Sequence, residues 1–216
     1  MTNILGEQNS IFNEYIAELR DTTIQQDKMR FRKNLERMGE IFAYEISKNF
    51  NYSKKSIETP LGVAEVPVLS DKLVVASIMR AGLPMHQGLL NIFDKAENGF
   101  VASYRKYSKD NTFTVKIEYT SCPRLDGKIL ILADPMLASG ISIELAVKAL
   151  LEKGDPVHIH IASVIASKEG VNYLCKRLPL KKVTLWLGAV DDELTVSSLI
   201  VPGMGDAGNL AFGEKT

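Results

Sequence analysis

The residues best suited to chemistry lie in one segment of the chain, residues 134–142, which read DPMLASGIS. An apolar run at residues 128–133 leads into the acid, and a short loop of small residues leads on into a helical pattern. Backbone N–H groups at such a helix start, with the hydroxyls of Ser139 and Ser142, can hold a phosphate without a lysine. Asp134 repels a phosphate but accepts hydrogen bonds from ribose hydroxyls. The segment predicts a sugar-phosphate site, and the alternative is a plain turn followed by a serine N-cap.

Two arginines, Arg80 and Arg105, stand among apolar neighbours and not on solvated helix faces. A guanidinium is costly to bury unless an anion meets it, so each is a candidate phosphate clamp. The alternative for either residue is a surface salt bridge. The 134–142 loop lacks the GxxxxGK[ST] arrangement, which disfavours a Walker-type nucleoside triphosphatase.

A glycine-rich segment, GMGDAG, occupies residues 203–208. Only eight residues follow it, so it cannot open the βαβ unit of a dinucleotide-binding fold. Its glycines instead predict a backbone that approaches a flat ligand closely and pairs with the ligand's edge. The alternative is an ordinary C-terminal loop.

Three other groups of polar residues are weaker candidates for metal binding or proton transfer. His158 and His160 share a face of a predicted strand, but no further metal ligands follow at usable spacing, so we interpret them as satisfied strand histidines. His86 lies in the helix after Arg80, where proton transfer is only a hypothesis. The acidic run at residues 191–193 could hold a divalent cation, and a solvated loop is the preferred interpretation.

The order of apolar runs predicts a scaffold that brings strand ends together. Short runs with little alternation, separated by helical patterns, are typical of strands buried on both faces of a parallel sheet. Such runs occupy residues 73–79, 128–133, 157–166 and 183–190. The fold class is therefore an open, mainly parallel α/β sheet flanked by helices. Such sheets bind ligands beyond the carboxyl ends of their strands, where the candidate residues fall.

Two further segments lie outside this repeat. Residues 100–107 and 113–120, joined by residues 108–111, predict a hairpin-like excursion. Residues 8–49 have helical spacing on two successive segments, which predicts a helical arm or cap before the sheet. We expect a single domain, residues 1–216, with residues 1–50 as a helical arm within it.

Composition narrows the class of protein. The chain has 216 residues, with 26 Lys and Arg against 26 Asp and Glu, so no global field favours nucleic acid or a membrane surface as a partner. Cys122 and Cys175 form neither a disulfide framework nor a CxxC pair, which indicates a reducing compartment. The N-terminus lacks a signal-peptide pattern, and no apolar run approaches the ~20 residues of a spanning helix. We predict a cytoplasmic protein.

The quoted residues resemble the uracil phosphoribosyltransferase family, whose signature for 5-phosphoribosyl 1-diphosphate (PRPP) usually reads DPMLATGGS. Three more motifs resemble this family in the same order: IMRAG at residues 78–82, SYRK at 103–106 and IVPGMGDAG at 200–208. AYEI at residues 43–46 and IETP at 57–60 match it further upstream. The resemblance extends from about residue 9 to residue 215, and four ordered motifs are far more specific than one.

The resemblance implies a type I phosphoribosyltransferase fold with a flexible hairpin and a C-terminal hood. It implies transfer of a phosphoribosyl group from PRPP to uracil, giving UMP and diphosphate in pyrimidine salvage, with Mg²⁺ held mainly by the substrate diphosphate. A homodimer or homotetramer is implied too, and some relatives are activated by GTP, for which no site in this chain is assigned.

The resemblance also implies roles for individual residues. Arg80 and Arg105 would contact the diphosphate, and Asp206 would contact uracil and reach PRPP through the metal and its waters. Asp134, Arg105 and Asp206 are the predicted catalytic residues. The 5-phosphate and ribose of PRPP would be held by Asp134, Pro135, Met136, Leu137, Ala138, Ser139, Gly140, Ile141 and Ser142, and uracil would be bound by Ile200, Gly205, Asp206 and Ala207.

The chain departs from the family pattern at several positions. Ile141 replaces a glycine and would be strained if the position needs a positive φ. Leu199 stands where the family usually has tyrosine, Asn209 and Leu210 replace an acid and a basic residue, and Lys106 replaces an acid. Reduced activity, altered base preference and a changed loop conformation all remain open. The alternatives are a non-catalytic nucleotide-binding regulator, which would ordinarily show a basic RNA face, and a phosphoribosyltransferase for another base.

Overall fold

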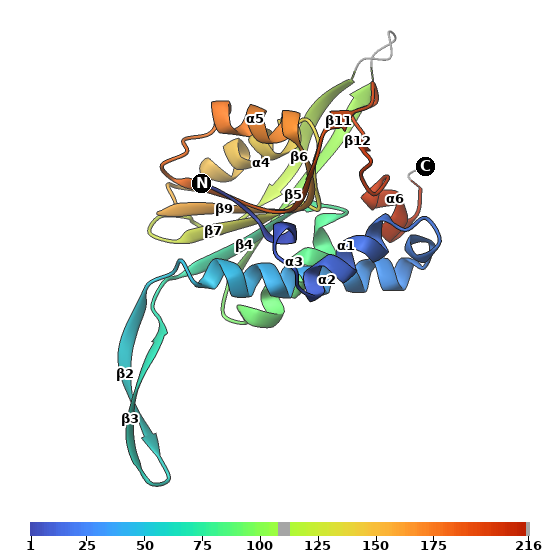
Figure 1. The fold of residues 1–216 in the computed structure, drawn as a ribbon. Helices are drawn as coiled ribbons and strands as arrows, with labels where there is room; N and C mark the ends of the chain where they lie inside the picture. Colours follow the sequence, from blue (N-terminus) through green and yellow to red (C-terminus); the bar gives the residue numbers. More distant parts are fainter. Residues whose placement is uncertain (108–112, 215–216) are drawn as a thin grey trace.

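A mainly parallel sheet forms the centre of the molecule (Figure 1). The computed structural model describes the backbone of residues 1–107 and 113–214, and its side-chain description omits residues 105–107, 113 and 114. The sheet runs in the order β1 (Thr2–Ile4), β10 (Val183–Asp191), β9 (His158–Ser167), β7 (Ile129–Ala133), β4 (Leu73–Met79), β5 (Glu97–Tyr107) and β6 (Phe113–Ser121). All neighbours on this path are parallel except β5 and β6. The predicted fold class is confirmed.

The central strands are buried on both faces, which explains their unbroken apolar runs. All five residues of β7 are buried, and β4 is buried up to its last residue. Helices α1 (Ile11–Arg20), α2 (Lys28–Ser47) and α3 (Gly82–Ile92) cover one face of the sheet, and α4 (Ile141–Leu151) and α5 (Lys168–Arg177) cover the other (Figure 1). Short 3-10 turns occur at Leu5–Glu7 and Ile24–Gln26.

The N-terminal helices belong to the core and form a layer against the sheet. Phe12 of α1 and Phe42 of α2 meet edge to face with ring centroids 5.2 Å apart. Both side chains are almost completely buried, together with Leu35 and Met38 of α2. Residues at the very start of the chain add β1 to the sheet, alongside β10. The apolar faces of these helices are therefore the covering layer that a parallel sheet requires.

Two antiparallel pairs extend from this body. β5 and β6 form the hairpin-like excursion that the sequence predicts, and its turn lies outside the described residues. A second pair, β2 (Tyr52–Thr59) and β3 (Gly62–Leu69), projects far from the sheet (Figure 1) and was not predicted. Most of its side chains are exposed, so no buried face marks it in the sequence.

The C-terminal segment folds over the carboxyl ends of the strands. β8 (Met136–Leu137) pairs with β9, β11 (Glu193–Leu194) pairs with β12 (Ile200–Val201), and α6 (Ala207–Phe212) follows. Arg32 of α2 donates to the Ala211 carbonyl at 2.7 Å, which fastens α6 to the helical layer. Within the described ranges, no helix is long and apolar enough to cross a membrane.

Candidate functional site

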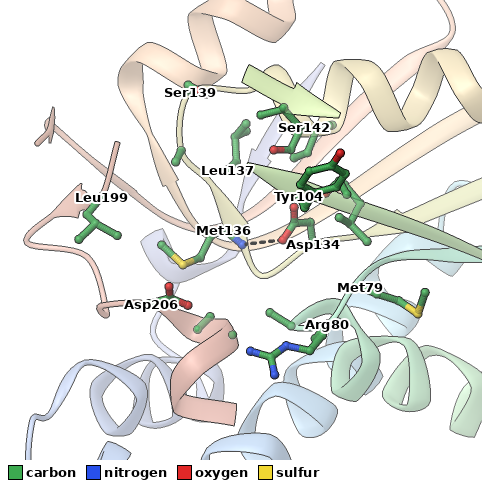
Figure 2. A pocket seen from close by; sticks show the side chains of 18 of the residues that line it. Met79, Arg80, Tyr104, Asp134, Met136, Leu137, Ser139, Ser142, Leu199 and Asp206 are labelled. Carbon is green, nitrogen blue, oxygen red and sulfur yellow. Dashed lines mark hydrogen bonds between the residues drawn. The ribbon is translucent and has the colours of Figure 1, made fainter. Parts of the chain in front are cut away.

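A cavity of about 500 Å³ lies at the carboxyl ends of β4 and β7, under the C-terminal segment (Figure 2). It gathers four segments that are far apart in the sequence: residues 78–81, residues 134–143, the C-terminal segment and the β5–β6 pair. From the first two come Ile78, Met79, Arg80, Ala81, Asp134, Met136, Leu137, Ala138, Ser139, Gly140, Ser142 and Ile143; the C-terminal segment adds Leu199, Asp206, Ala207, Gly208, Asn209 and Glu214. Ser103, Tyr104 and Val115 of the β5–β6 pair complete the lining.

The loop after β7 has the geometry of an anion cradle. Gly140 has a φ of 84° and precedes α4 as its N-cap residue, so the chain turns through a left-handed conformation directly into the helix. Ile141 is the first residue of α4, and the positive φ falls on its neighbour, so Ile141 is not strained. The N–H groups at the start of α4 therefore face the same loop as Ser139 and Ser142, which line the cavity. Pro135 and Ile141 belong to this loop but do not line the cavity.

The first turn of α5 supports this loop from behind. Ser167 Oγ donates to the Ala138 carbonyl at 2.6 Å and accepts from the Gly170 N–H at 2.9 Å. A Cβ at Gly170 would lie 2.1 Å from the Ala138 oxygen, so only glycine allows this approach. The loop is thus held by a neighbouring helix through contacts that its own sequence does not reveal.

Asp134 is a half-buried acid directly after β7. Its Oδ1 accepts the Met136 N–H at 3.3 Å (Figure 2). Burial raises the pKa of Asp134 to about 7, against the opposing effect of that hydrogen bond. The carboxyl group therefore changes charge near neutral pH, and in its ionised form it can accept hydrogen bonds from hydroxyl groups.

Arg80 follows β4 and reaches the C-terminal segment. Its Nη2 donates to the Gly213 carbonyl at 2.9 Å, and its buried Nε has no partner among the described residues. Figure 2 shows Arg80, Asp134 and Asp206 around the same cavity. Arg105 lies in β5, but its side chain is outside the described part of the molecule, so its predicted contact stays a prediction.

The glycine-rich segment closes the other side of the cavity. Asp206 is the N-cap of α6, where its Oδ1 accepts the Asn209 N–H at 3.0 Å, and Ala207 lines the cavity beside it. Gly205 has a φ of 82°, which glycine adopts without strain. Gly205 and Ile200, both predicted to bind uracil, belong to this loop but lie outside the cavity lining, and Ile200 is buried.

The histidines have structural partners, as predicted for the strand pair. His158 Nε2 meets Thr184 Oγ1 at 2.9 Å, and His160 Nδ1 accepts the Trp186 indole N–H at 3.0 Å. Burial, with a smaller contribution from His158, lowers the pKa of His160 to about 3. His86 is buried on α3 against Asn98, away from the cavity. These residues stabilise the fold.

Residues that sequence reasoning missed enter the site from its edges. Tyr104 lines the cavity next to the predicted Arg105, and its position in the SYRK motif was a usable signal. Glu214 lines it from the C-terminal end, and no pattern in the sequence points to it. Leu199 and Asn209, noted as departures from the family pattern, do lie at the cavity.

The fold and the cavity agree with the type I phosphoribosyltransferase arrangement that the sequence resemblance implies, with a loop that turns into a helix start and a C-terminal segment over the strand ends. A family model described as uracil phosphoribosyltransferase matches residues 7–214. The chain belongs to the uracil phosphoribosyltransferase family.

Individual relatives resemble the chain over nearly its whole length. A Porphyromonas gingivalis protein named uracil phosphoribosyltransferase is 53% identical over 211 residues, which cover 98% of this chain and 97% of the relative. A protein of the same name from Methanothermobacter thermautotrophicus is 35% identical over 210 residues, covering 96% and 94%. The solved structure titled AQ2163 protein from Aquifex aeolicus superposes with a TM-score of 0.86 at 29% identity, covering 99% of this chain and 98% of that one.

Proposed function

We propose that the protein transfers the phosphoribosyl group of PRPP to uracil, giving UMP and diphosphate. One observation carries this proposal: the loop 134–142, Arg80 and the loop 200–208 come together around one cavity although they lie far apart in the sequence. These are three of the four motifs that resemble the family. The name of the 53% identical relative supports the same reaction.

The geometry suggests how the reaction proceeds. The 5-phosphate binds at the start of α4, and ionised Asp134 accepts hydrogen bonds from the ribose hydroxyls. Arg80 meets the charge of the diphosphate. The bond between ribose C1 and the diphosphate oxygen breaks, and its electron pair leaves with the diphosphate. Uracil N1 bonds to C1, and the proton of N1 passes to solvent. Most of the catalytic effect comes from positioning and from fixed charges around an oxocarbenium-like state.

Recognition of the base falls to the loop 200–208. Backbone N–H and C=O groups of this loop pair with the carbonyls and ring N–H of uracil. Cytosine carries an amino group where uracil carries a carbonyl, so a donor would face a donor and the base would be rejected.

We also propose Mg²⁺ as the cofactor. Among the described residues, no three His, Cys, Asp or Glu side chains form a ready-made cation site. Mg²⁺ commonly keeps several waters and binds through one or two carboxylates together with substrate phosphates. Asp206 suits this role because it lines the cavity and caps α6 with one oxygen, Oδ1. When bound, the ion would offset negative charge on the leaving diphosphate.

A product assay tests the reaction. Purified protein is incubated with labelled uracil, PRPP and Mg²⁺, and UMP is separated and counted; parallel reactions contain hypoxanthine, guanine, xanthine or cytosine. We expect UMP from uracil only. Product from a purine base would instead indicate a phosphoribosyltransferase for another base. UMP binding with tight, salt-sensitive RNA association and no turnover would indicate a regulator.

We propose a homodimer or homotetramer in solution. The β2–β3 hairpin projects from the body (Figure 1) and exposes apolar side chains, with Leu61 100% and Val63 72% exposed. Apolar groups on a projecting segment are typical of an interface. Light scattering should give at least twice the chain mass of 23.9 kDa, and Leu61→Asp with Val63→Asp should lower that mass. A monomer at micromolar concentration would contradict the assembly.

The location stays a prediction. Cys122 and Cys175 are both free thiols in the structure. Free thiols suit the reducing cytoplasm, which we propose as the place where this protein acts.

A further inference from the structure

We propose that Arg20 and Asp191 are positioning residues for uracil binding. They grip Gly203, and through it they hold the loop 200–208 in the shape that receives the base. The inference rests on the proposed function, and it goes further by assigning affinity for one of the two substrates to an ion pair that does not line the cavity.

The ion pair joins two elements that are distant in the sequence. Arg20 is the last residue of α1 and Asp191 the last residue of β10. The guanidinium meets the carboxylate end on through both Nη atoms, with Nη2 to Oδ1 at 2.7 Å and Nη1 to Oδ2 at 2.8 Å. Such two-bond pairing fixes the orientation of both groups as well as their distance.

Both backbone polar groups of Gly203 are bound by this pair. Arg20 Nη1 also donates to the Gly203 carbonyl at 2.8 Å, and the Gly203 N–H donates to Asp191 Oδ2 at 2.8 Å. One loop residue is therefore held from two sides by charged groups, and hydrogen bonds to charged groups are stronger than those between neutral groups.

Burial makes this pair different from an ordinary surface salt bridge. The side chain of Asp191 is 8% exposed and that of Arg20 is 23% exposed. Burial tends to raise the pKa of Asp191, but the hydrogen bonds from Arg20 and Gly203 outweigh it and lower that pKa. The next residue, Asp192, pairs with Lys168 at side-chain exposures of 72% and 65%. That exposed pair offers a matched control, because such pairs contribute little.

The position of Gly203 determines the positions of the predicted base-binding residues. A Cβ at Gly203, whose φ is 59°, would lie 2.1 Å from the Ile200 carbonyl oxygen, so the two backbones are in direct contact. Three residues further on, Asp206 caps α6 and lines the cavity. A shift of Gly203 would displace both ends of the loop. Backbone groups cannot change rotamer as side chains do, so the hydrogen bonds between this loop and uracil depend on the position of the loop.

The PRPP side of the cavity is held by other contacts. The loop 134–142 depends on the side chain of Ser167 and on Gly170 of the α5 region. Ser167 is paired with Asp191 in the β9–β10 ladder through the backbone, and a substitution of the Asp191 side chain leaves that pairing in place. Loss of the Arg20–Asp191 ion pair should therefore weaken uracil binding and leave PRPP binding unchanged. A merely structural role would lower stability and affect both substrates alike.

Steady-state kinetics of Asp191→Asn and Asp192→Asn test the proposal. For Asp191→Asn we expect the KM for uracil to rise roughly tenfold to a hundredfold, as for loss of a charged hydrogen-bond partner. The KM for PRPP should change by less than about twofold. Asp192→Asn should resemble the wild type. Equal rises in both KM values, an unchanged KM for uracil, or the same effect in Asp192→Asn would overturn the proposal.

Two further measurements keep the test decisive. Arg20→Lys keeps the positive charge but loses the two-bond guanidinium contact, so it should raise the KM for uracil by a smaller factor. This variant replaces Asp191→Asn in the test if Asp191→Asn fails to fold. Amide hydrogen exchange of the whole protein should quicken at residues 200–208 in either variant and not in Asp192→Asn. This readout needs no turnover. If the wild type made no UMP, the proposed reaction would be refuted, but hydrogen exchange would still test whether Arg20 and Asp191 hold the loop. Unchanged exchange at residues 200–208 in both variants would overturn that role.

Discussion

Replacing Asp134 by asparagine should have opposite effects on stability and activity, because burial of the carboxylate destabilises the fold while its charge helps to bind PRPP. The pKa of Asp134 is raised to about 7 from its ordinary value of 3.8. Between these two values the folded state holds a proton that the unfolded state has released. The free energy of unfolding therefore falls as pH rises from about 4 to 7, by at most ~1.4 kcal/mol per pH unit, and levels off above 7. Asparagine lacks this pH dependence.

The magnitude follows from the size of the shift. About three pKa units correspond to an upper limit of ~4 kcal/mol of destabilisation in the wild type at pH 8. The side chain is only half-buried and faces a cavity that admits water, so we expect about 1–2 kcal/mol. Asp134→Asn should thus equal the wild type in stability near pH 4 and exceed it at pH 8. The same variant should lose roughly tenfold to a hundredfold in kcat/KM for PRPP, because a neutral amide is a weaker acceptor for hydroxyls.

Urea unfolding without ligand, repeated from pH 4 to pH 8, measures the first effect. Initial rates at varied PRPP over the same range measure the second, and the wild-type kcat/KM should rise with an inflection near pH 7 that the variant lacks. The reasoning is refuted if the variant is the less stable protein at pH 8, or if the stability difference is the same at every pH.

Three other changes test the contacts around the site. Gly170→Ala places a methyl group against the Ala138 carbonyl, at 2.1 Å before relaxation, and should raise the KM for PRPP at least about tenfold; an unchanged KM would contradict the support given to the loop. Ile141→Gly should lower the unfolding free energy by only about 1 kcal/mol, with turnover retained, because the helix start carries no strain to relieve. Loss of most activity would show that the isoleucine contributes directly. The pKa of His160 is lowered to about 3. The free energy of unfolding of the protein should therefore fall as pH drops below 6.5, since between pH 6.5 and 3 only the unfolded state binds the proton. Fluorescence of Trp186, the single tryptophan, should report this acid transition, and His160→Gln should flatten it.

The predictable parts of this protein are those whose physics is local. An unbroken apolar run predicts a doubly covered strand, and β7 is buried throughout as that pattern requires. An acid followed by small residues and a helical pattern predicts a strand that passes through a short loop into a helix start, and Gly140 supplies the left-handed turn of that loop. The condition for strain at Ile141, a positive φ, is not met, because Gly140 completes the left-handed turn just before the helix begins.

The β2–β3 hairpin escaped prediction for a related reason. Almost all of its residues are exposed or half-buried, so neither face carries a hydrophobic period tied to the core. The helical layer over residues 8–49 was predicted as helix, but its place against the sheet was not. Helical spacing identifies an apolar face without telling which surface covers it.

By itself, the sequence determined the α/β class, the order of the loops and the residue types that they present. Only the tertiary structure decided which of these act together. Asp134 titrates near neutrality because other segments bury it, and Asp191 meets Arg20 across 171 positions of chain to hold Gly203. Burial and ion pairing depend on neighbours that the fold brings from elsewhere, whereas strand, turn and cap patterns depend on neighbours along the chain.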